Sequence, residues 1–427
     1  MSDTIFALAT APGKAGLSVI RISGPDAFSV SQALGGGEGP LRLARLRTLV
    51  DGDGSTLDQA IVLTFGHGAS FTGEDVVELH LHGSIAVQRA VMRRLTELDI
   101  ARPATAGEFT KRALLNGRMD LTQVQGLADV IDAETEEQRR AAMRVMDGEM
   151  SALVLEWRRR LVRAAALLEA TIDFADEEVP VDVMPEVRDL ISPVIAEMRH
   201  EIDGVDAARS LREGFSVAIV GEPNAGKSSL LNAIVRGDPA LVSDIPGTTR
   251  DVIEQAIDLD GLRVVFADTA GLRETSDPVE RLGVERALQR ATDADLRIFL
   301  HEGAQVPDLS VHCMPGDLVY RSKSDQHGAA GISAMTGEGI ADLLAAVSER
   351  LTSLVGVAGF VSRESDRTAL ATASDILDRI LQQIGTHDVE LVVSDIRMAI
   401  TGLERIIGQI GVEDVLDEVF RSFCLGK

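Results

Sequence analysis

The 427-residue chain has few cysteines and few aromatic residues. Its two cysteines, Cys313 and Cys424, are too few and too far apart in sequence for a disulfide framework or a zinc knuckle, and they fit a reducing compartment. One tryptophan, one tyrosine and an aromatic content of 3% argue against a surface that stacks the bases of single strands. Small disulfide-rich proteins and base-stacking binders of nucleic acid are therefore disfavoured.

Positive charge and long apolar runs are also scarce. Lysine and arginine total 42 against 67 aspartate and glutamate, so the surface, with a net charge of −25, repels nucleic acid and anionic membranes. Arginine clusters in residues 139–144 and 158–163 are candidate RNA patches, although solvated faces of a long helix are the favoured interpretation. Because the chain has no signal-peptide pattern and no apolar run of about eighteen residues, we expect a cytoplasmic protein without membrane contact.

A phosphate-binding loop follows the apolar run 215–220. Residues 221–229 read Gly-Glu-Pro-Asn-Ala-Gly-Lys-Ser-Ser, and a helix-like segment comes next. Its glycines let backbone N–H groups point at phosphates, Lys227 supplies a positive charge, and Ser228 offers its hydroxyl to Mg²⁺. The chain is therefore predicted to bind a nucleoside triphosphate. The predicted contacts from this loop are Asn224, Ala225, Gly226, Lys227, Ser228 and Ser229.

Two further segments are predicted to contact the phosphates and the metal. The strand-like run 262–267 ends in Asp268-Thr269-Ala270-Gly271, where Asp268 is placed to reach Mg²⁺ through a water. Before it lies the segment Ser243-Asp244-Ile245-Pro246-Gly247-Thr248-Thr249. A threonine in this segment, which we assign as Thr249, completes the Mg²⁺ coordination only when the third phosphate is present. The segment is therefore a candidate switch.

Guanine recognition is expected from the segment Ser322-Lys323-Ser324-Asp325. In an Asn-Lys-x-Asp element, the carboxylate accepts hydrogen bonds from the guanine N1–H and exocyclic amine. Serine stands here in place of asparagine, and a hydroxyl is shorter than an amide and has one donor rather than two. We therefore expect guanine specificity with weakened affinity. The loop that closes over the base is expected at Ser333, Ala334 and Met335.

The hydrolytic step needs a residue that orients water. Ras-type proteins place a glutamine directly after the Asp-x-x-Gly element, but Leu272 occupies that position here and cannot orient water. Acidic candidates nearby are Glu274, Asp277 and Glu280. A solvated carboxylate at a helix start is the commoner role for each of them.

Periodicity and length indicate several domains. Short β-like runs at 5–10, 17–22, 60–65 and 76–82 with a helix near 86–98 predict an α+β domain, whereas the pattern is helical from about 121 and again after 355. We therefore expect a multidomain α/β and α protein, in which a helical bundle is split by an inserted P-loop, Ras-like GTPase domain. The proline-interrupted stretch 306–319 is expected to replace a helix and a strand of that domain. Expected domains are the N-terminal domain 1–118, the helical parts 119–211 and 356–427, and the G domain 212–355.

Over nearly its full length, the chain resembles the bacterial tRNA-modification GTPases known as MnmE or TrmE. The matching motifs are residues 268–274, Ser70-Phe71-Thr72-Gly73-Glu74-Asp75, Gly107-Glu108-Phe109, Arg112-Ala113, Leu115-Asn116 and the ending Phe423-Cys424-Leu425-Gly426-Lys427. That ending resembles the Cys-x-Gly-Lys terminus of the family. Chain packing gives no evident reason for such a motif at an end that would ordinarily fray.

The resemblance implies a GTPase that works with a flavin-dependent partner of the MnmG or GidA type, on which FAD is expected. Together they would add an aminomethyl-type group (carboxymethylaminomethyl) to C5 of the tRNA wobble uridine, with carbon from a tetrahydrofolate derivative. The first domain would form a homodimer and bind the folate, and tRNA would be held mainly by the partner. The implied folate contacts are Arg21, Glu78, Arg118, where the family commonly has lysine, and Lys427.

The resemblance further implies a potassium ion that helps hydrolysis. Its ligands would be Asn224, Ser243, Ile245 through its backbone oxygen, and Thr248, and Glu280 would orient the attacking water when G domains dimerise. Cys424 is left as either a nucleophile or a thiol that shapes the folate pocket. His80 and His82 share one face of a strand, and hydrogen-bonded or core histidines are favoured over metal ligands.

Two other functions are alternatives. A ribosome-assembly or translational regulatory GTPase would leave residues 424–427 unexplained and would normally carry an RNA-binding appendage, which we do not find in the sequence. A folate-dependent one-carbon enzyme with the GTPase as a timer is the second. Tetrahydrofolate binding by residues 1–118 and the C-terminus would favour it over the assembly GTPase, but not over tRNA modification.

Overall fold

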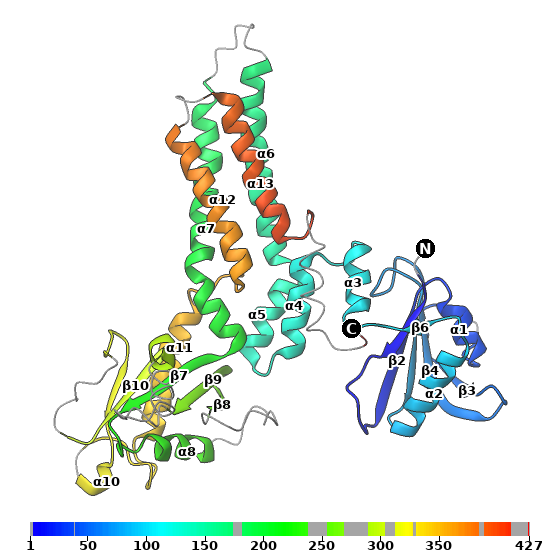
Figure 1. Cartoon of the computed structure of the whole chain (residues 1–427), viewed down its shortest axis with the longest axis horizontal. Helices are drawn as coiled ribbons and strands as arrows, with labels where there is room; N and C mark the ends of the chain where they lie inside the picture. The colour runs from blue at the N-terminus through cyan, green and yellow to red at the C-terminus, as the bar shows by residue number, and fades with distance from the viewer. Residues whose placement is uncertain are drawn as a thin grey trace, which may run out of the picture. The chain divides into compact units, whose positions relative to one another are not determined.

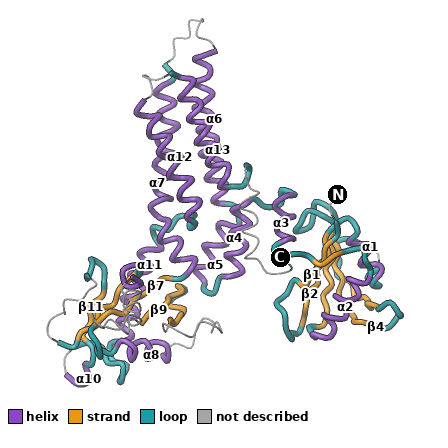
Figure 2. The backbone as a smooth tube through the Cα atoms, viewed as in Figure 1, coloured by secondary structure: helices purple, strands orange, loops and turns teal. Residues whose placement is uncertain are grey.

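A computed structural model gives the fold. It describes residues 3–37, 39–173, 182–237, 254–268, 289–303, 312–327, 330–383, 388–410 and 426. The chain forms two compact units, one of residues 1–128 and 404–427 and the other of residues 129–403. Figure 1 labels their helices and strands, and Figure 2 shows the same backbone by type of secondary structure.

The first unit is built on a largely antiparallel sheet. Its described strands pair in the order β3-β4-β5-β2-β1-β6, with β6 joining β1 in parallel. The strands are β1 Ile5–Leu8, β2 Leu17–Ser23, β3 Arg45–Val50, β4 Thr56–Phe65, β5 Val76–His82 and β6 Arg102–Pro103. The helices are α1 Ala27–Ala33, α2 Ile85–Glu97 and α3 Glu108–Leu115. The short strands and the helix expected in residues 4–100 are confirmed.

Alternation along the strands gives this sheet two different faces. Ile20 and Ile22 of β2, like Val77 and Leu79 of β5, are fully buried in one core together with residues of α1 and α2. Because successive side chains of a strand point to opposite sides, the intervening residues lie on the other face. That second face carries the expected folate contacts of β2 and β5, which the next subsection describes by their partners.

The second unit contains a parallel sheet. Its described strands pair in the order β11-β10-β7-β9-β8, and β8 alone is antiparallel to its neighbour. They are β7 Phe215–Gly221, β8 Glu254–Leu259, β9 Leu262–Asp268, β10 Leu296–His301 and β11 Leu318–Arg321. The near-continuous burial of β7 and β10 is typical of central strands in a sheet covered on both faces. Helices α8 Lys227–Gly237 and α11 Ile340–Val355 pack into its core, and α10 Ser324–His327 is a short turn of helix.

The strand β11 corrects one expectation from the sequence. Residues 306–319 were expected to replace a strand of this sheet, but Leu318–Arg321 pairs in parallel with β10. The strand is only four residues long and its side chains are partly exposed, so the apolar signal of a buried strand is weak. Residues 304–311 lie outside the described part of the chain.

Helices precede and follow the parallel sheet in sequence. They are α4 Leu121–Asp132, α5 Glu136–Met146, α6 Glu149–Asp173, α7 Met184–Glu213, α12 Glu364–Gln383 and α13 Val389–Ile406. α7 packs against both α6 and α12. Trp157 of α6 is buried, and its Nε1–H donates to Glu197 of α7 at 2.7 Å. Segments on either side of the sheet in sequence therefore share one helical assembly (Figure 1).

The chain enters the sheet directly from α7. Gly214, with a φ of +107°, separates α7 from β7. The carboxylate of Asp295, at the start of β10, accepts hydrogen bonds from Ser210 Oγ at 2.6 Å and from the backbone N–H of Ser216 at 2.7 Å. One side chain therefore joins the last turn of α7 to two strands.

The chain leaves the sheet along the same helix. Glu201 of α7 accepts hydrogen bonds from the backbone N–H groups of Phe360 at 2.7 Å and Val361 at 3.3 Å. Gly204 lies one turn further on, and a Cβ there would sit 2.5 Å from the carbonyl oxygen of Val357. Only glycine fits this close approach of backbone to backbone.

A third contact joins α5 to the turn between β8 and β9. The backbone N–H of Glu137 donates to the carbonyl of Gly261 at 3.1 Å. Arg263 of β9 pairs with Glu134 at 2.6 Å, and Ser348 of α11 donates to Asp260 at 2.6 Å. The turn is thus held from two sides, and its tight geometry places both Asp260 and Gly261 at positive φ.

We expect Gly204→Ala to destabilise the helical assembly, because its Cβ would collide with main-chain atoms of residues 357–359. Overpacking of this kind costs about 1–3 kcal/mol. Gly402→Ala in α13 is the matched control, since nothing lies within 4 Å of its Cβ position and alanine favours a helix by about 1 kcal/mol over glycine. Urea unfolding followed by Trp157 fluorescence should show a lower midpoint for Gly204→Ala only; equal midpoints would contradict the close approach.

Candidate functional site

The predicted phosphate-binding loop has the required strand–loop–helix structure. It connects the end of β7 to the start of α8, and Asn224 and Gly226 adopt positive φ angles of 67° and 91°. Lys227 is buried and its Nζ donates to the carbonyls of Gly221 at 2.9 Å and Glu222 at 3.0 Å. The ammonium group is therefore held over the loop, at the positive end of a helix that favours anions.

β9 brings a second predicted residue to the same edge of the sheet. Asp268 ends β9 and pairs in register with Ile219 of β7, two residues before the phosphate-binding loop. The carboxyl ends of neighbouring parallel strands are where open α/β sheets bind ligands. The remaining predicted phosphate and metal contacts lie outside the described residues: Ser243, Asp244, Ile245, Pro246, Gly247, Thr248, Thr249, Thr269, Ala270, Gly271 and the water-orienting candidate Glu280.

One cavity joins the phosphate-binding loop to the predicted base contacts. Its volume is about 170 Å³. Gly226 and Ser229 line it from the loop and α8, and the segments that follow β11 and Ile332 close it from the other side. The predicted base contacts that line it are Ser322, Lys323, Asp325, Ala334 and Met335. The structure therefore brings together residues about one hundred positions apart in sequence around one space.

Ser333 orients the carboxylate of this cavity. It is fully buried, its Oγ donates to Asp325 Oδ1 at 2.6 Å, and it accepts from the backbone N–H of Thr336 at 3.2 Å. Ser322 is buried as well, and its Oγ lies 3.4 Å from the carbonyl of His301, at the long limit of a hydrogen bond. The Asp325 carboxylate is thus already oriented by Ser333. Ser322, which replaces asparagine, makes only a weak side-chain contact.

The expected folate contacts Arg21 and Glu78 lie side by side on β2 and β5. They are paired in register, with Arg21 Nη2 2.9 Å from Glu78 Oε1. His80 Nε2 lies 3.3 Å from the other carboxylate oxygen. Glu78 therefore bridges a permanent cation and a titratable ring.

Two motif phenylalanines, which the sequence did not assign to the site, border this group. The guanidinium carbon of Arg21 lies 5.3 Å from the ring centroid of Phe71 and 5.8 Å from that of Phe109, within the range of cation–π attraction. In the sequence, the signal that these two phenylalanines belong to the site is that they lie in the Ser70–Asp75 and Gly107–Phe109 motifs. Local pattern alone does not show that both rings meet the same arginine.

Segments next to Arg118 and Lys427 approach the same region of the first unit. A Cβ on Gly73 would lie 3.2 Å from Arg118 Cγ, so Arg118 packs against the Ser70–Asp75 loop. Gly426, with a φ of +93°, is so close to Leu8 that a Cβ would clash with the Leu8 carbonyl oxygen. Leu8 is the neighbour of Ala7, which pairs with Arg21. Cys424 and Lys427 themselves lie outside the described residues.

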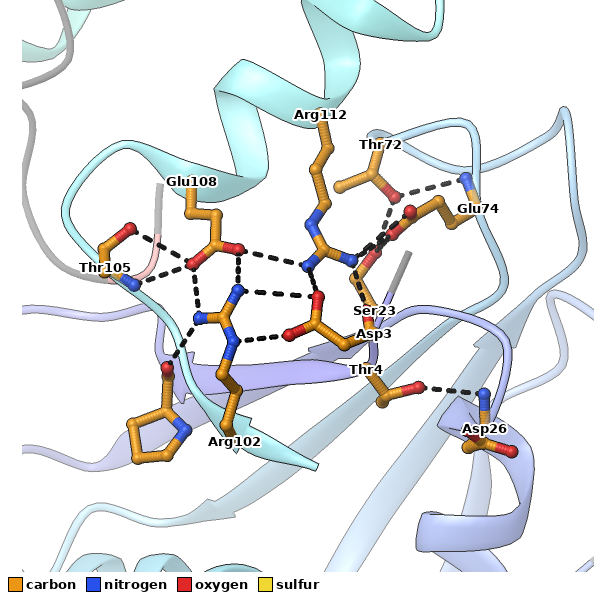
Figure 3. Close-up of polar contacts among 11 residues, drawn as sticks. Asp3, Thr4, Ser23, Asp26, Thr72, Glu74, Arg102, Thr105, Glu108 and Arg112 are labelled. Carbon is orange, nitrogen blue, oxygen red and sulfur yellow. Dashed lines mark hydrogen bonds and ion pairs between the residues drawn. The ribbon is translucent and has the colours of Figure 1, made fainter. Parts of the chain in front are cut away.

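Charged residues of these motifs, together with Asp3 and Arg102, form a network around the buried Arg112 (Figure 3). Arg112 is 9% exposed and donates to Glu74 at 3.0 Å, to Glu108 at 3.1 Å, and to both the carbonyl and the carboxylate of Asp3. Arg102 of β6 pairs with Glu108 at 2.6 Å. The network fastens α3 and the Ser70–Asp75 loop to the sheet, and thereby sets the positions of Phe71 and Phe109.

Hydrogen bonding controls the pKa of Glu108. Burial alone would raise it, but the hydrogen bonds from Arg102, the Thr105 N–H and Arg112 outweigh burial and lower the pKa to about 2. Desolvation opposes the charge of Arg112 too, yet Glu74 and Glu108 raise its pKa above the ordinary value. Glu108 and Arg112 are therefore both charged at neutral pH.

Histidines and helix arginines take the roles favoured from the sequence. His80 contacts Glu78, and His82 Nδ1 lies 2.7 Å from Asp58, so both are hydrogen-bonded histidines. The helix arginines pair with carboxylates of nearby residues, as expected of solvated helix faces. Such pairs are Arg139 and Arg140 with Glu136, Arg144 with Glu149, Arg159 and Arg160 with Glu156, and Arg163 with Glu186.

None of the described helices is long and apolar enough to span a membrane.

Comparison with known proteins covers the whole chain. Residues 4–118 match the family model "GTP-binding protein TrmE N-terminus", and residues 121–424 match "MnmE helical domain". The tRNA modification GTPase MnmE of Cereibacter sphaeroides (strain ATCC 17029 / ATH 2.4.9) is 53% identical over 430 residues, and that of Ruegeria pomeroyi is 52% identical over 429, with 100% of each chain covered. A solved structure of Aquifex aeolicus Era bound to GDP and aluminium fluoride is 22% identical with a TM-score of 0.24, covering 38% of this chain and 66% of that one. A score this low carries no argument.

We expect Glu108→Gln to destabilise the first unit in a pH-dependent way. Because the folded-state pKa of about 2 lies below the ordinary value of 4.5, the carboxylate stabilises the fold above about pH 4.5 and loses this contribution as the pH falls toward 2. After allowance for solvent screening, we expect a loss of about 1–2 kcal/mol at neutral pH.

The measurement is urea unfolding followed by circular dichroism at pH values from neutral to about 3. The difference in the free energy of unfolding between wild type and Glu108→Gln should narrow below about pH 4.5. Glu97→Gln, which removes an exposed carboxylate paired with Arg93 on α2, is the control and should cost little. A difference in the free energy of unfolding that stays constant across this pH range would contradict the lowered pKa of Glu108.

Proposed function

The chain belongs to the MnmE family of tRNA modification GTPases, and from this premise we propose that it hydrolyses GTP and takes part in modifying the tRNA wobble uridine. The observation that carries the GTPase part is the cavity shared by the phosphate-binding loop and residues 322–335. A triphosphate on the loop would place its base beside Asp325, which Ser333 holds ready as an acceptor. Guanine offers the matching donors.

The metal sites are proposed from the donor types. Ser228 and Thr249 would hold Mg²⁺, with Asp268 acting through a water, and hydroxyl and carboxylate oxygens are the donors that Mg²⁺ prefers. Asn224, which is exposed and has a left-handed backbone, would join Ser243, Ile245 and Thr248 around K⁺. A bound cation supplies positive charge where negative charge develops during phosphoryl transfer. Glu280 would orient the attacking water.

The first unit is proposed to bind a tetrahydrofolate derivative. Glu78 keeps acceptor capacity beyond its contacts with Arg21 and His80, so it can receive hydrogen bonds from a pterin. Arg118 and Lys427 would meet the glutamate tail as cations. The close packing of Gly426 on Leu8 supports this assignment, because it brings the C-terminal end beside the strand that pairs with Arg21. Cys424 would then lie at the pocket, as a nucleophile or as part of its wall.

Partners are proposed from the surface. Leu46 and Ile61 face each other across β3 and β4 and are 64% and 43% exposed, and β3 is an edge strand of the described sheet, which suits a homodimer through the N-terminal domain. The net charge of −25 supports a division of labour in which a flavin-dependent partner of the MnmG or GidA type, carrying FAD, holds most of the tRNA. We place the protein in the cytoplasm.

We also propose the domain plan expected from the sequence: an N-terminal domain 1–118, a helical domain 119–211 and 356–427, and a Ras-like G domain 212–355 inserted into it. The packing of α7 on α12 supports one helical domain, since 150 residues separate these helices and include the parallel sheet. The attachment of the sheet at both of its ends to α7 supports an insertion.

The modification function predicts the nucleoside content of tRNA. A strain lacking this protein should lose a C5-modified wobble uridine, and wild-type protein should restore it. Gly426→Ala should restore little, because its Cβ would displace the C-terminal end from Leu8, whereas Gly16→Ala, with nothing within 4 Å, should restore it fully. Mass spectrometry of nucleosides from bulk tRNA measures this. Unchanged tRNA in the deletion strain would leave the alternative of a ribosome-assembly or translational GTPase.

The potassium site predicts the salt dependence of hydrolysis. Above the concentration at which G domains dimerise, GTP turnover should be several-fold faster in KCl than in NaCl at equal ionic strength. The affinity for GDP should be similar in both salts, because the ion acts on the charge that develops during phosphoryl transfer. Phosphate release assays measure the rates, and equal turnover in the two salts would remove the K⁺ assignment.

A further inference from the structure

Lys323 reaches the cavity in an unusual way. Its φ of 57° is in the left-handed region, which is uncommon for a residue other than glycine. Lys323 lines the cavity, while its Nζ pairs with the carboxylate of Glu302, a residue that does not line it. The ammonium group is thus paired with a residue outside the cavity, while Lys323 itself borders the space.

Glu302 is itself held by neighbouring residues. It directly follows β10, and its carbonyl accepts a hydrogen bond from Arg321 Nε at 3.2 Å. His301 Nδ1 lies 2.9 Å from the carbonyl of Gly303, which closes a tight turn around Glu302. The register of β10 and β11 places His301 opposite Arg321. The backbone of Glu302 is therefore held by its neighbours, and its partly exposed carboxylate meets Lys323 from the end of the adjacent strand.

We propose that Glu302 is a positioning residue for nucleotide binding, which holds Lys323 so that its stem forms one wall of the base pocket. A lysine stem is apolar and can cover a flat ring while its ammonium group stays at the surface. Without Glu302 the long side chain regains its rotamer freedom, and ordering it again on nucleotide binding costs free energy. The inference rests on the proposed assignment of residues 322–325 to the base.

Ser322 explains why this wall has a large share in binding here. Its hydroxyl is short and lies near the His301 carbonyl, so it offers the base less than an asparagine amide would. Base recognition then depends on the hydrogen bonds to Asp325 and on the fit between the ring and its apolar surroundings. Lys323 is a part of those surroundings whose position depends on an ion pair with a second side chain.

The test is a double-mutant cycle on nucleotide affinity. Glu302→Gln should raise the dissociation constant of a fluorescent GDP analogue about two- to five-fold, the range expected of a partly exposed ion pair, and leave kcat unchanged. In a Lys323→Met background the same change should have no effect. The loss should also shrink at high salt, and Glu302→Asp should recover part of it. Glu349→Gln, an exposed carboxylate on α11, is the control with the same change of charge.

The outcomes separate this inference from the proposed function. The positioning role would be overturned if Glu302→Gln bound the GDP analogue as tightly as Glu349→Gln does. It would also be overturned if Glu302→Gln weakened binding equally whether residue 323 is lysine or methionine. In both cases GTP recognition stands. Asp325→Asn tests the pocket itself and should shift preference from guanosine to xanthosine nucleotides. If Asp325→Asn leaves the preference unchanged in competition, the assignment of residues 322–325 fails, and the role of Glu302 fails with it.

Discussion

Two carboxylates that accept hydrogen bonds from other segments fix the parallel sheet to the helices. Asp295 accepts from Ser210 Oγ of α7 and from the N–H of Ser216 in β7 where the chain enters. Glu201 of α7 accepts from the N–H groups of Phe360 and Val361 where the chain leaves. Charge-assisted bonds of this kind are stronger than those between neutral groups. Both ends of the sheet are thereby tied to one helix, α7, so the sheet cannot turn on a single flexible linker.

The contact of α5 with the β8–β9 turn is a third attachment of the sheet to the helices, and it couples movement of these two strands to α5. β8 follows the candidate switch segment and β9 ends at Asp268. Because β8 and β9 are paired along their length, a displacement of either strand moves the turn at their far end. Such a displacement must either break the contacts of Gly261 and Arg263 or move α5 with it.

Local features of this structure could be predicted from the sequence, and long-range pairings could not. The phosphate-binding loop between strand and helix is confirmed, because glycine positions and apolar runs encode it within a few residues. Arg112 was visible only as part of a motif; its partners Asp3 and Glu74 lie 109 and 38 residues away. The pair of Glu302 with Lys323 likewise depends on the order of strands β10 and β11 in the sheet, and no spacing rule reports that order.

Charge pairing also bears on how an acidic protein can act on tRNA. Affinity for nucleic acid comes largely from cations that neutralise phosphates and release counterions. The arginines of α5 and α6 face carboxylates on their own or neighbouring helices, so a phosphate would have to displace those carboxylates to reach them. That competition lowers the gain from each contact. On these helices, composition and geometry agree, and both disfavour a phosphate-binding surface.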